Sequence, residues 1–168
     1  MLINMRSVVT LTQKALKFLI EAKGEIVNVS SMAAGPQAQP SVTYYAMSKT
    51  ALDQFTRSIA IDLIQHGVRV NSVSPGVVKT SFGLIEGMLQ DKVGRLQDKL
   101  ISFLESHKEC QPNGKVGQPI DIAHIISFLA DRKRSSYIIG RTIHADGGSS
   151  LVMGMQAHNM MDILTTSK

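Results

Sequence analysis

The segment from Glu25 to Gly76 constrains the fold most, because it holds two short apolar stretches separated by a long amphipathic one. Residues 25–30 and 68–73 are rich in β-branched side chains and do not alternate strictly between apolar and polar. That composition is typical of strands buried on both faces of a parallel sheet. Residues 43–65 lie between them and carry one apolar helical stripe, formed by Leu52, Phe55, Ile59 and Leu63. The sequence therefore predicts an α/β fold built on a parallel sheet.

Further helices are expected before and after this segment. The first runs from about Asn4 to Lys23 and ends at Gly24, a residue suited to the left-handed conformation that follows a helix. Apolar residues at steps of three and four predict a core-facing stripe of Val8, Leu11, Ala15, Phe18 and Ala22. Another helix begins at residues 118–121, with a proline in its first turn. Residues 138–145 then lead into a third strand.

The bulk properties exclude several classes of protein. The 168 residues suit a single domain, and the one cysteine, Cys110, excludes an internal disulfide framework. We expect a reducing compartment, the cytoplasm. The basic residues before Glu21 also resemble a mitochondrial presequence, but a core-facing helix explains the same stretch. The net charge of +5 comes from scattered residues, and no apolar run could span a bilayer, so neither nucleic acid nor a membrane span is predicted.

Tyr45 and Lys49 carry the most distinctive chemistry in the chain. Four residues apart on the expected helix, they lie on the same face, one turn apart. A phenol with a pKa near ~10 is a poor base at neutral pH, and a neighbouring ammonium lowers such a pKa toward the range of general acid–base catalysis. Tyr44 is the rival, but position 48, four residues after it, is serine. In the turn after the first strand, the Ser31 hydroxyl could hold a carbonyl or alcohol oxygen beside the phenol.

Together these motifs resemble the short-chain dehydrogenase/reductase family. Five motifs match that family in order and spacing: a strand ending in NVSS, the YYAMSK run that opens a long helix, RVNSVSPG, PGVVKT and HADGG. The resemblance spans residues 2–148. It implies that residues 1–150 form the C-terminal part of a Rossmann-like, doubly wound domain with about three strands and flanking helices. Residues 151–168 would be a polar C-terminal tail.

The resemblance implies an enzyme that transfers hydride between a nicotinamide, of NAD or NADP, and a small carbonyl or secondary alcohol. Tyr45 would act as acid and base. Lys49 would activate it and hold the nicotinamide ribose, and Ser31 would position the substrate oxygen. Asn4, within NMRSV, would hold a water of the proton relay, although an asparagine near a helix start is also a common cap. No metal ligand is assigned.

The serine assignment has rivals. Ser31 precedes Tyr45 by one position more than the usual family spacing, which a one-residue insertion in the loop to Pro40 would explain. Ser30 is the less favoured candidate. With a loop of regular length, Met32 would fall at the serine position and the site would lack its hydroxyl.

The PGVVKT loop follows the second strand at its carboxyl end, where ligands of open α/β sheets bind. The family resemblance implies that Pro75, Gly76, Val78 and Thr80 contact the nicotinamide region. Residues 81–117 would form a lid over the substrate. Its apolar residues would line the pocket or pack in the core: Phe82, Leu84, Ile85, Met88 and Leu89.

The sequence has no Gly-rich turn after a first strand and no residue placed to read the adenosine ribose. We therefore expect the strand at residues 25–30 to be an exposed sheet edge. This chain alone should bind dinucleotide poorly and turn over little. The resemblance also implies homo-oligomers formed through the helices at residues 4–23 and 43–65. The alternative to an enzyme is an inactive half-domain isoform that pairs with, or modulates, a full-length relative.

Overall fold

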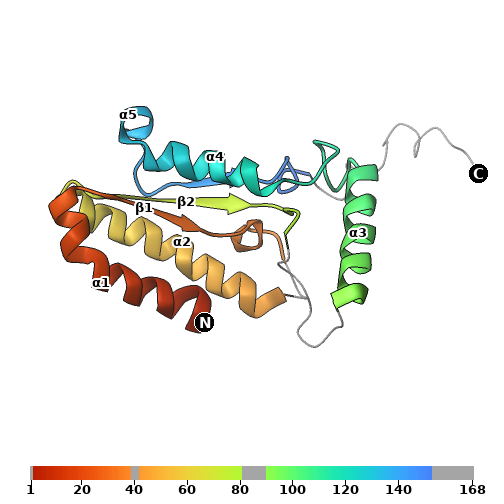
Figure 1. Ribbon diagram of the computed structural model, residues 1–168, viewed down its shortest axis with the longest axis horizontal. Helices are drawn as coiled ribbons and strands as arrows, with labels where there is room; N and C mark the ends of the chain where they lie inside the picture. The colour runs from red at the N-terminus through yellow and green to blue at the C-terminus, as the bar shows by residue number, and fades with distance from the viewer. Residues whose placement is uncertain (1, 39–41, 81–89, 153–168) are drawn as a thin grey trace, which may run out of the picture. The chain divides into compact units, whose positions relative to one another are not determined.

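The computed structural model describes residues 2–38, 42–80 and 90–152 and contains a three-stranded parallel sheet with helices on both faces (Figure 1). The strands are β1 (Glu25–Val29), β2 (Arg69–Pro75) and β3 (Thr142–Ala145), in the order β1-β2-β3. Val73 of β2 pairs with Val29 on one side and with Ile143 on the other. The predicted α/β class and parallel sheet are confirmed.

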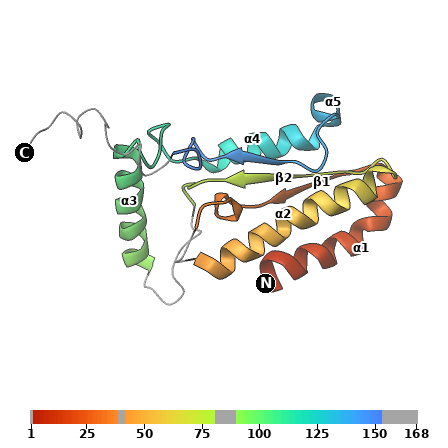
Figure 2. The ribbon, with the colours of Figure 1, turned by 180° about the vertical axis from the view of Figure 1, so that it is seen from behind.

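One compact unit contains Met1–Pro75 and Ile120–Ala145. On one face of its sheet lie α1 (Ser7–Ala22), which continues from a π-helical turn at Leu2–Arg6, and α2 (Thr43–Ile64). On the other face lies α4 (Pro119–Ala130), as Figure 1 and, from behind, Figure 2 show. A short 3-10 helix, Met32–Ala34, follows β1 and precedes α2.

The core of this unit lies between α2 and the sheet. Its buried side chains are Ala60, Leu63, Val68 and Val70, and the partly buried ones around them are Leu16, Leu19, Ile20, Ile26, Ile59 and Ile139. Burying each large aliphatic side chain contributes about 1.5–3 kcal/mol. The stripe predicted for α2 is confirmed, since Leu52 and Leu63 are buried and the other two stripe residues, Phe55 and Ile59, are half-buried.

The stripe predicted for α1 is only partly right. Val8 and Ala15 are half-buried, but Leu11 is 69% exposed, Phe18 is 68% exposed, and Ala22 is exposed as well. The reason is the position of the sheet beneath the helix. Because β1 is the outermost strand among the described residues, no further strand lies under that side of α1.

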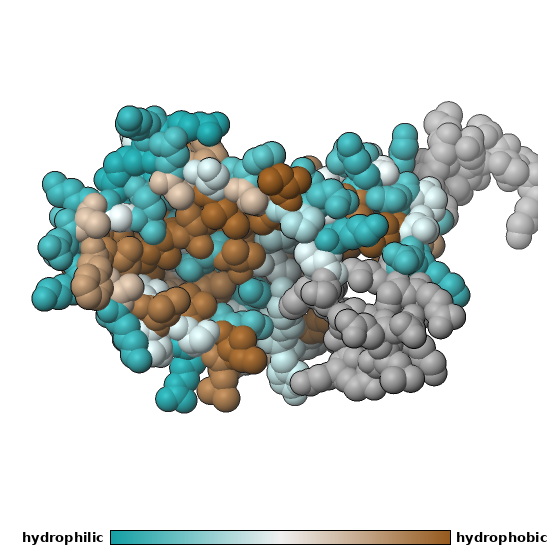
Figure 3. Space-filling view, viewed as in Figure 1, coloured by the Kyte–Doolittle hydropathy of each residue, from teal (hydrophilic) through white to brown (hydrophobic). Residues whose placement is uncertain are grey.

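An open groove therefore runs between α1 and the free edge of β1. Its volume is about 500 Å³, and most of its lining is apolar, including Ile3, Val8, Leu11, Ala15, Leu19, Ile26 and Val29. Figure 3 shows apolar surface gathered over the region where α1 and β1 lie. In the described part of the chain, the predicted exposed edge of the first strand is confirmed.

Two local features differ from the prediction, the end of α1 and the segment after α4. In α1 the left-handed residue is Lys23, with φ 48°, one position before the predicted Gly24. The basic cluster after α4 forms a short helix of its own, α5 (Arg132–Ser135), which the sequence did not predict. The Asp131 side chain caps α5 by accepting a hydrogen bond of 2.9 Å from the Lys133 N–H.

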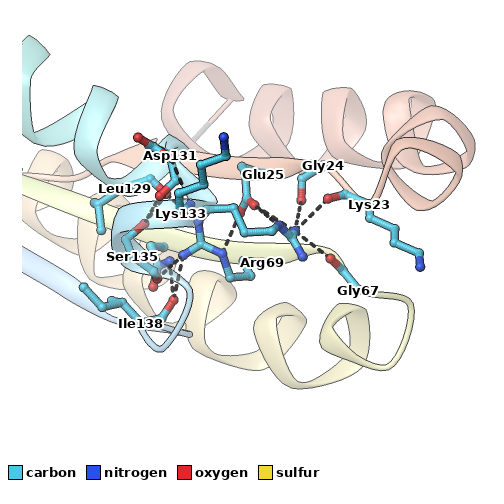
Figure 4. Close-up of polar contacts among 12 residues, drawn as sticks. Lys23, Gly24, Glu25, Gly67, Arg69, Leu129, Asp131, Lys133, Ser135 and Ile138 are labelled. Carbon is cyan, nitrogen blue, oxygen red and sulfur yellow. Dashed lines mark hydrogen bonds and ion pairs between the residues drawn. The ribbon is translucent and has the colours of Figure 1, made fainter.

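An ion-pair network joins α5 to the start of β1 and β2 (Figure 4). Arg69 is 2% exposed, its Nε lies 2.9 Å from Glu25 Oε2, and Arg132 meets the other oxygen of Glu25 at 2.7 Å. Both guanidinium groups also donate to main-chain carbonyls, those of Leu129, Ser135 and Ile138 for Arg69 and those of Lys23 and Gly67 for Arg132. A buried cation is stable only with such a set of acceptors.

The second compact unit contains Gly76–Pro119 and Asp146–Lys168. Its helix is α3 (Gln90–Ser106), and the segment that follows α3 pairs with the PGVVKT loop through a bridge between Val78 and Gly117. The apolar residues predicted to line a lid pocket, Phe82, Leu84, Ile85, Met88 and Leu89, lie outside the described residues, as does most of the predicted tail.

Candidate active site

The helix α2 presents Tyr45 and Lys49 one turn apart, as their spacing predicts. Lys49 Nζ lies 5.7 Å from the centroid of the Tyr45 ring, which is within reach of a cation–π interaction. Tyr45 is half-buried, whereas Tyr44 is 84% exposed. This geometry favours Tyr45 over Tyr44 as the reacting phenol.

Lys49 is anchored to the strand beside it. Its Nζ donates a hydrogen bond of 2.8 Å to the carbonyl of Val29, the last residue of β1. Partial burial lowers the pKa of Lys49 from its ordinary value of 10.5, and the nearby charge of Asp53 acts in the opposite sense. Asp53 also accepts a hydrogen bond of 3.2 Å from the Thr142 hydroxyl, and this contact ties α2 to β3. The sequence analysis did not single out Asp53.

Asn4 reaches α2 from the π-helical turn before α1. Its Nδ2 donates to Ser48 Oγ at 3.1 Å, and Ser48 Oγ donates to the main-chain carbonyl of Tyr45 at 2.7 Å. Single π-turns beside α-helices are frequent at functional sites. The alternative role of Asn4 as a helix cap is wrong, because α1 has Arg6 at its N-cap position and no side-chain cap hydrogen bond.

Ser48 is the residue of this cluster that sequence reasoning missed. It is completely buried, and it lies three positions after Tyr45, where a hydroxyl on a helix can return to the backbone one turn earlier. Its position directly before Lys49 was the available signal. Nothing in the sequence connected it with Asn4, because the two residues come from separate helices.

Ser31 lies just beyond β1 and is half-exposed. Its Oγ accepts a hydrogen bond of 3.2 Å from the Ala33 N–H and so caps the short 3-10 helix. Ser30 is instead 3% exposed, and its hydroxyl has no hydrogen-bond partner in the described structure. A ligand could therefore reach Ser31 more easily than Ser30. The Thr50 hydroxyl, 3.4 Å from the carbonyl of Ala34, holds this turn against α2.

Buried hydrogen bonds fix α2, the helix that carries Tyr45 and Lys49, on the sheet. Asn28 Nδ2 donates to Thr56 Oγ1 at 2.8 Å, and Ser72 Oγ donates to the Asn28 carbonyl at 3.1 Å. Asn71, in β2, donates to the carbonyl of Ile138 and accepts from the Arg141 N–H, so it ties β2 to the backbone that leads into β3.

The residues predicted to bind cofactor divide between the two compact units. Pro75 ends β2 in the first unit, and Gly76, Val78 and Thr80 belong to the second. Within the second unit the loop is held by Gly117, which accepts from the Lys79 N–H at 2.9 Å and donates to the Val77 carbonyl at 3.0 Å.

Gly76 is required by close packing. A Cβ at this position would lie 2.7 Å from both Cα and Cβ of Asp146, well inside van der Waals contact. Its φ is not among the positive values of the chain, so a permissive backbone is not the reason for glycine here.

The described ranges hold neither a cluster of metal-ligating side chains nor a helix suited to crossing a membrane. No group of three or more His, Cys, Asp and Glu side chains there could hold a metal ion. Helices in the same ranges are too short or too polar to cross a membrane.

The parallel α/β fold belongs to a class of proteins that comparison with known proteins identifies. Residues 1–150 match the family model described as enoyl-(acyl carrier protein) reductase. The chain belongs to the short-chain dehydrogenase/reductase family and represents its C-terminal part.

Individual relatives support the same assignment. The chain is 33% identical over 151 residues to the 3-oxoacyl-acyl-carrier-protein reductase FabG of Rickettsia conorii, covering 89% of this chain and 56% of that protein. It is 34% identical over 146 residues to the uncharacterised oxidoreductase YxbG of Bacillus subtilis, covering 87% and 51%. The chain thus spans about half the length of the curated relatives it matches.

Two solved structures from Caenorhabditis elegans are more similar in sequence. A short-chain dehydrogenase/reductase of unknown function, solved with cofactor, is 56% identical with a TM-score of 0.87, and the match covers 93% of this chain and 56% of that one. A glucose dehydrogenase in its apo form is 52% identical with a TM-score of 0.74, and the match covers 89% and 55%.

Proposed function

We propose that this chain carries the acid–base residues of an NAD(P)-dependent oxidoreductase that interconverts a carbonyl and a secondary alcohol. The observation that carries the proposal is the Tyr45–Lys49 pair, with the Lys49 ammonium 5.7 Å from the phenol ring centroid and anchored on the last carbonyl of β1. The bonds from Asn4 through Ser48 to the backbone of Tyr45 support it, because they fix the first turns of α2.

The proposed chemistry assigns one task to each side chain. In the reductive direction the Tyr45 hydroxyl donates its proton to the substrate oxygen, and in the oxidative direction the phenolate takes that proton back. The Lys49 ammonium stabilises the negative charge that develops on the phenol oxygen. The Ser31 hydroxyl donates a hydrogen bond to the same substrate oxygen, and Asn4 orders the water that exchanges protons with solvent.

The donor set suits a nicotinamide nucleotide. Tyr45 and Lys49 offer a phenol and an ammonium to ribose hydroxyls, and the loop of Pro75, Gly76, Val78 and Thr80 offers main-chain groups to the nicotinamide carboxamide. When bound, the nicotinamide donates or accepts the hydride. NAD and NADP remain equal candidates, because the residues that read the adenosine ribose are not recognisable in this sequence.

The substrate is proposed only at the level of its functional group. The relatives are named a 3-oxoacyl-acyl-carrier-protein reductase and a glucose dehydrogenase. The chemistry extended to this chain is the interconversion of a small carbonyl compound and its alcohol. The single free cysteine, Cys110, suits the reducing conditions of the cytoplasm, where we propose that the protein acts.

The test is the substitution Tyr45→Phe, made in a chimaera that joins this chain to the N-terminal half of the 56% identical C. elegans relative. Turnover of NADH or NADPH with aldose and 3-oxoacyl substrates should fall at least about 100-fold, because the proton donor is lost. The dissociation constant for the cofactor should change little. Tyr44→Phe is the matched control and should keep full activity. A Tyr45→Phe enzyme that keeps its turnover would refute the assignment.

A second candidate function is a non-catalytic half-domain that pairs with a full-length relative. The free edge of β1 and the exposed Leu11, Phe18 and Ile61 on α1 and α2 favour it. The same exposed side chains would serve a homo-oligomer. Sedimentation of this chain alone and with the C. elegans relative discriminates these states. Association should be abolished by Leu11→Glu combined with Phe18→Glu, and it should survive the control Tyr137→Glu elsewhere on the surface.

A further inference from the structure

We propose that Gln111 is a positioning residue for the Gly76–Thr80 loop: its buried carboxamide fixes the turn Asp146–Ser149, against which that loop closes. The inference rests on the proposed function in one respect, since this loop is the segment proposed to contact the nicotinamide. All of the groups involved belong to the second compact unit.

The Gln111 carboxamide uses both of its ends. The side chain is 2% exposed, its Nε2 donates to the main-chain carbonyl of Asp146 at 3.2 Å, and its Oε1 accepts from the Ser149 hydroxyl at 2.6 Å. A buried amide whose donor and acceptor are both engaged has a single favourable orientation, because turning it would leave polar groups unpaired. Gln111 therefore clamps the turn at two points three residues apart.

The turn itself is shaped around this side chain. Gly147 has φ +63°, and an added Cβ there would overlap the end of the Gln111 side chain, so a larger residue would have to displace the amide. The main chain adds a further contact from the same segment, since the Asn113 N–H donates to the Gly147 carbonyl at 3.1 Å. The Asp146 carboxylate closes the turn internally by accepting from the N–H groups of Gly148 and Ser150.

The opposite side of the turn meets the loop. The backbone of Gly76 approaches Asp146 so closely that an added Cβ would fall 2.7 Å from its Cα. The Asp146 carbonyl thus accepts a hydrogen bond from the Gln111 amide, while the Asp146 Cα is in close packing contact with Gly76. A displacement of the turn would change the space available to Gly76, and the loop could not keep its present backbone.

The segment that carries Gln111 also holds the loop directly. Six residues beyond Gln111, Gly117 exchanges hydrogen bonds with Lys79 and Val77 of the loop. The segment 111–117 is therefore hydrogen-bonded to the turn at one end and to the loop at the other. At the first end, the buried side chain of Gln111 makes the hydrogen bonds that fix the position of the turn.

The test is hydrogen exchange of individual amides in the 168-residue chain, followed by NMR. The reporter amides are those of Lys79 and Gly117, and the reference amide is that of Gly140, which is bonded to the Val70 carbonyl in the first unit. Gln111→Met removes both side-chain hydrogen bonds but keeps similar volume, and Ser149→Ala removes one of them. Lys115→Ala, an exposed site in the same segment, is the matched control.

In Gln111→Met the reporter amides should exchange about tenfold faster relative to the reference amide, which corresponds to the loss of one to two hydrogen bonds. Ser149→Ala should accelerate them less, and Lys115→Ala should not. Equal acceleration of reporter and reference amides in both variants, or no acceleration, overturns the proposal, because Gln111 would then act only on general stability. Should Gln111→Met fail to fold, the milder Ser149→Ala carries the same comparison.

A second readout separates this inference from the proposed function. In the chimaera that restores the N-terminal half, Gln111→Met should weaken NADH or NADPH binding about tenfold. The substitution Tyr45→Phe should leave the thermal midpoint of the protein at the wild-type value. Faster loop exchange with unchanged cofactor affinity would overturn the link from Gln111 to the cofactor. Loss of catalysis in Tyr45→Phe tests the acid–base assignment and does not bear on the exchange result.

Discussion

The substitution Glu25→Gln should destabilise the protein more than any other neutralisation of a single carboxylate in the described structure. Glu25 is the counter-ion of Arg69, whose side chain is 2% exposed, and its own side chain is 14% exposed. Removing one partner of a buried ion pair costs about 3–5 kcal/mol, because the remaining charge is left without compensation. Arg69 keeps three main-chain carbonyl acceptors, so the lower end, about 3 kcal/mol, is expected.

The second partner contributes less. The Arg132 side chain is 43% exposed, and an exposed ion pair contributes only about 0–1 kcal/mol. The whole loss of about 3 kcal/mol should lower the thermal midpoint by roughly 6–12 °C for a chain of this length. Urea unfolding followed by circular dichroism measures the free energy directly, with unchanged slope if only stability has changed.

The control for this experiment is Asp62→Asn, which neutralises an exposed carboxylate on α2. It should change stability by no more than about 0.5 kcal/mol. The loss in Glu25→Gln should also persist at molar salt, since a buried pair is screened little. A loss below about 1 kcal/mol, or one that disappears in salt, would mean that Arg69 is stabilised by its carbonyl partners alone.

Two further predictions concern Lys49 and the buried hydrogen bond between Thr56 and Asn28. Because burial lowers the folded-state pKa of Lys49, the unfolded chain binds more protons between that pKa and 10.5, so stability should rise with pH across this window. Urea unfolding at several pH values should show that rise in the wild type relative to Lys49→Met, and parallel curves would contradict it. Thr56→Val should cost about 1–3 kcal/mol in the same assay by leaving the Asn28 amide without its acceptor, while Thr56→Ser stays near wild type; equal losses would refute this reason.

The features predicted well from the sequence are those fixed by local pattern. The strand at Glu25–Val29 and the helix at Thr43–Ile64 follow from β-branched composition and from the helical apolar stripe. The pairing of Tyr45 with Lys49 follows from the helical repeat alone. Family membership could be read in advance because the motifs lie in these same local elements.

The features that were missed depend on contacts between distant parts of the chain. The bonds from Asn4 to Ser48 and from Arg132 to Glu25 join residues that are 44 and 107 positions apart. The α1 stripe was misjudged at Leu11 and Phe18 for a similar reason. A periodic pattern identifies an apolar face, but only the sheet order shows that β1 is outermost and leaves that face uncovered.

We propose that this chain holds the acid–base residues of a dehydrogenase, whereas its sequence has no glycine-rich turn of the kind that binds a cofactor pyrophosphate. The most direct test is a fluorescence titration of the purified 168-residue chain with NADH and NADPH, beside the same titration of the chimaera. We expect no saturation by the chain alone at micromolar cofactor and saturation in that range by the chimaera. Micromolar binding by the chain alone would contradict the claim, because its own residues would then suffice to hold a dinucleotide.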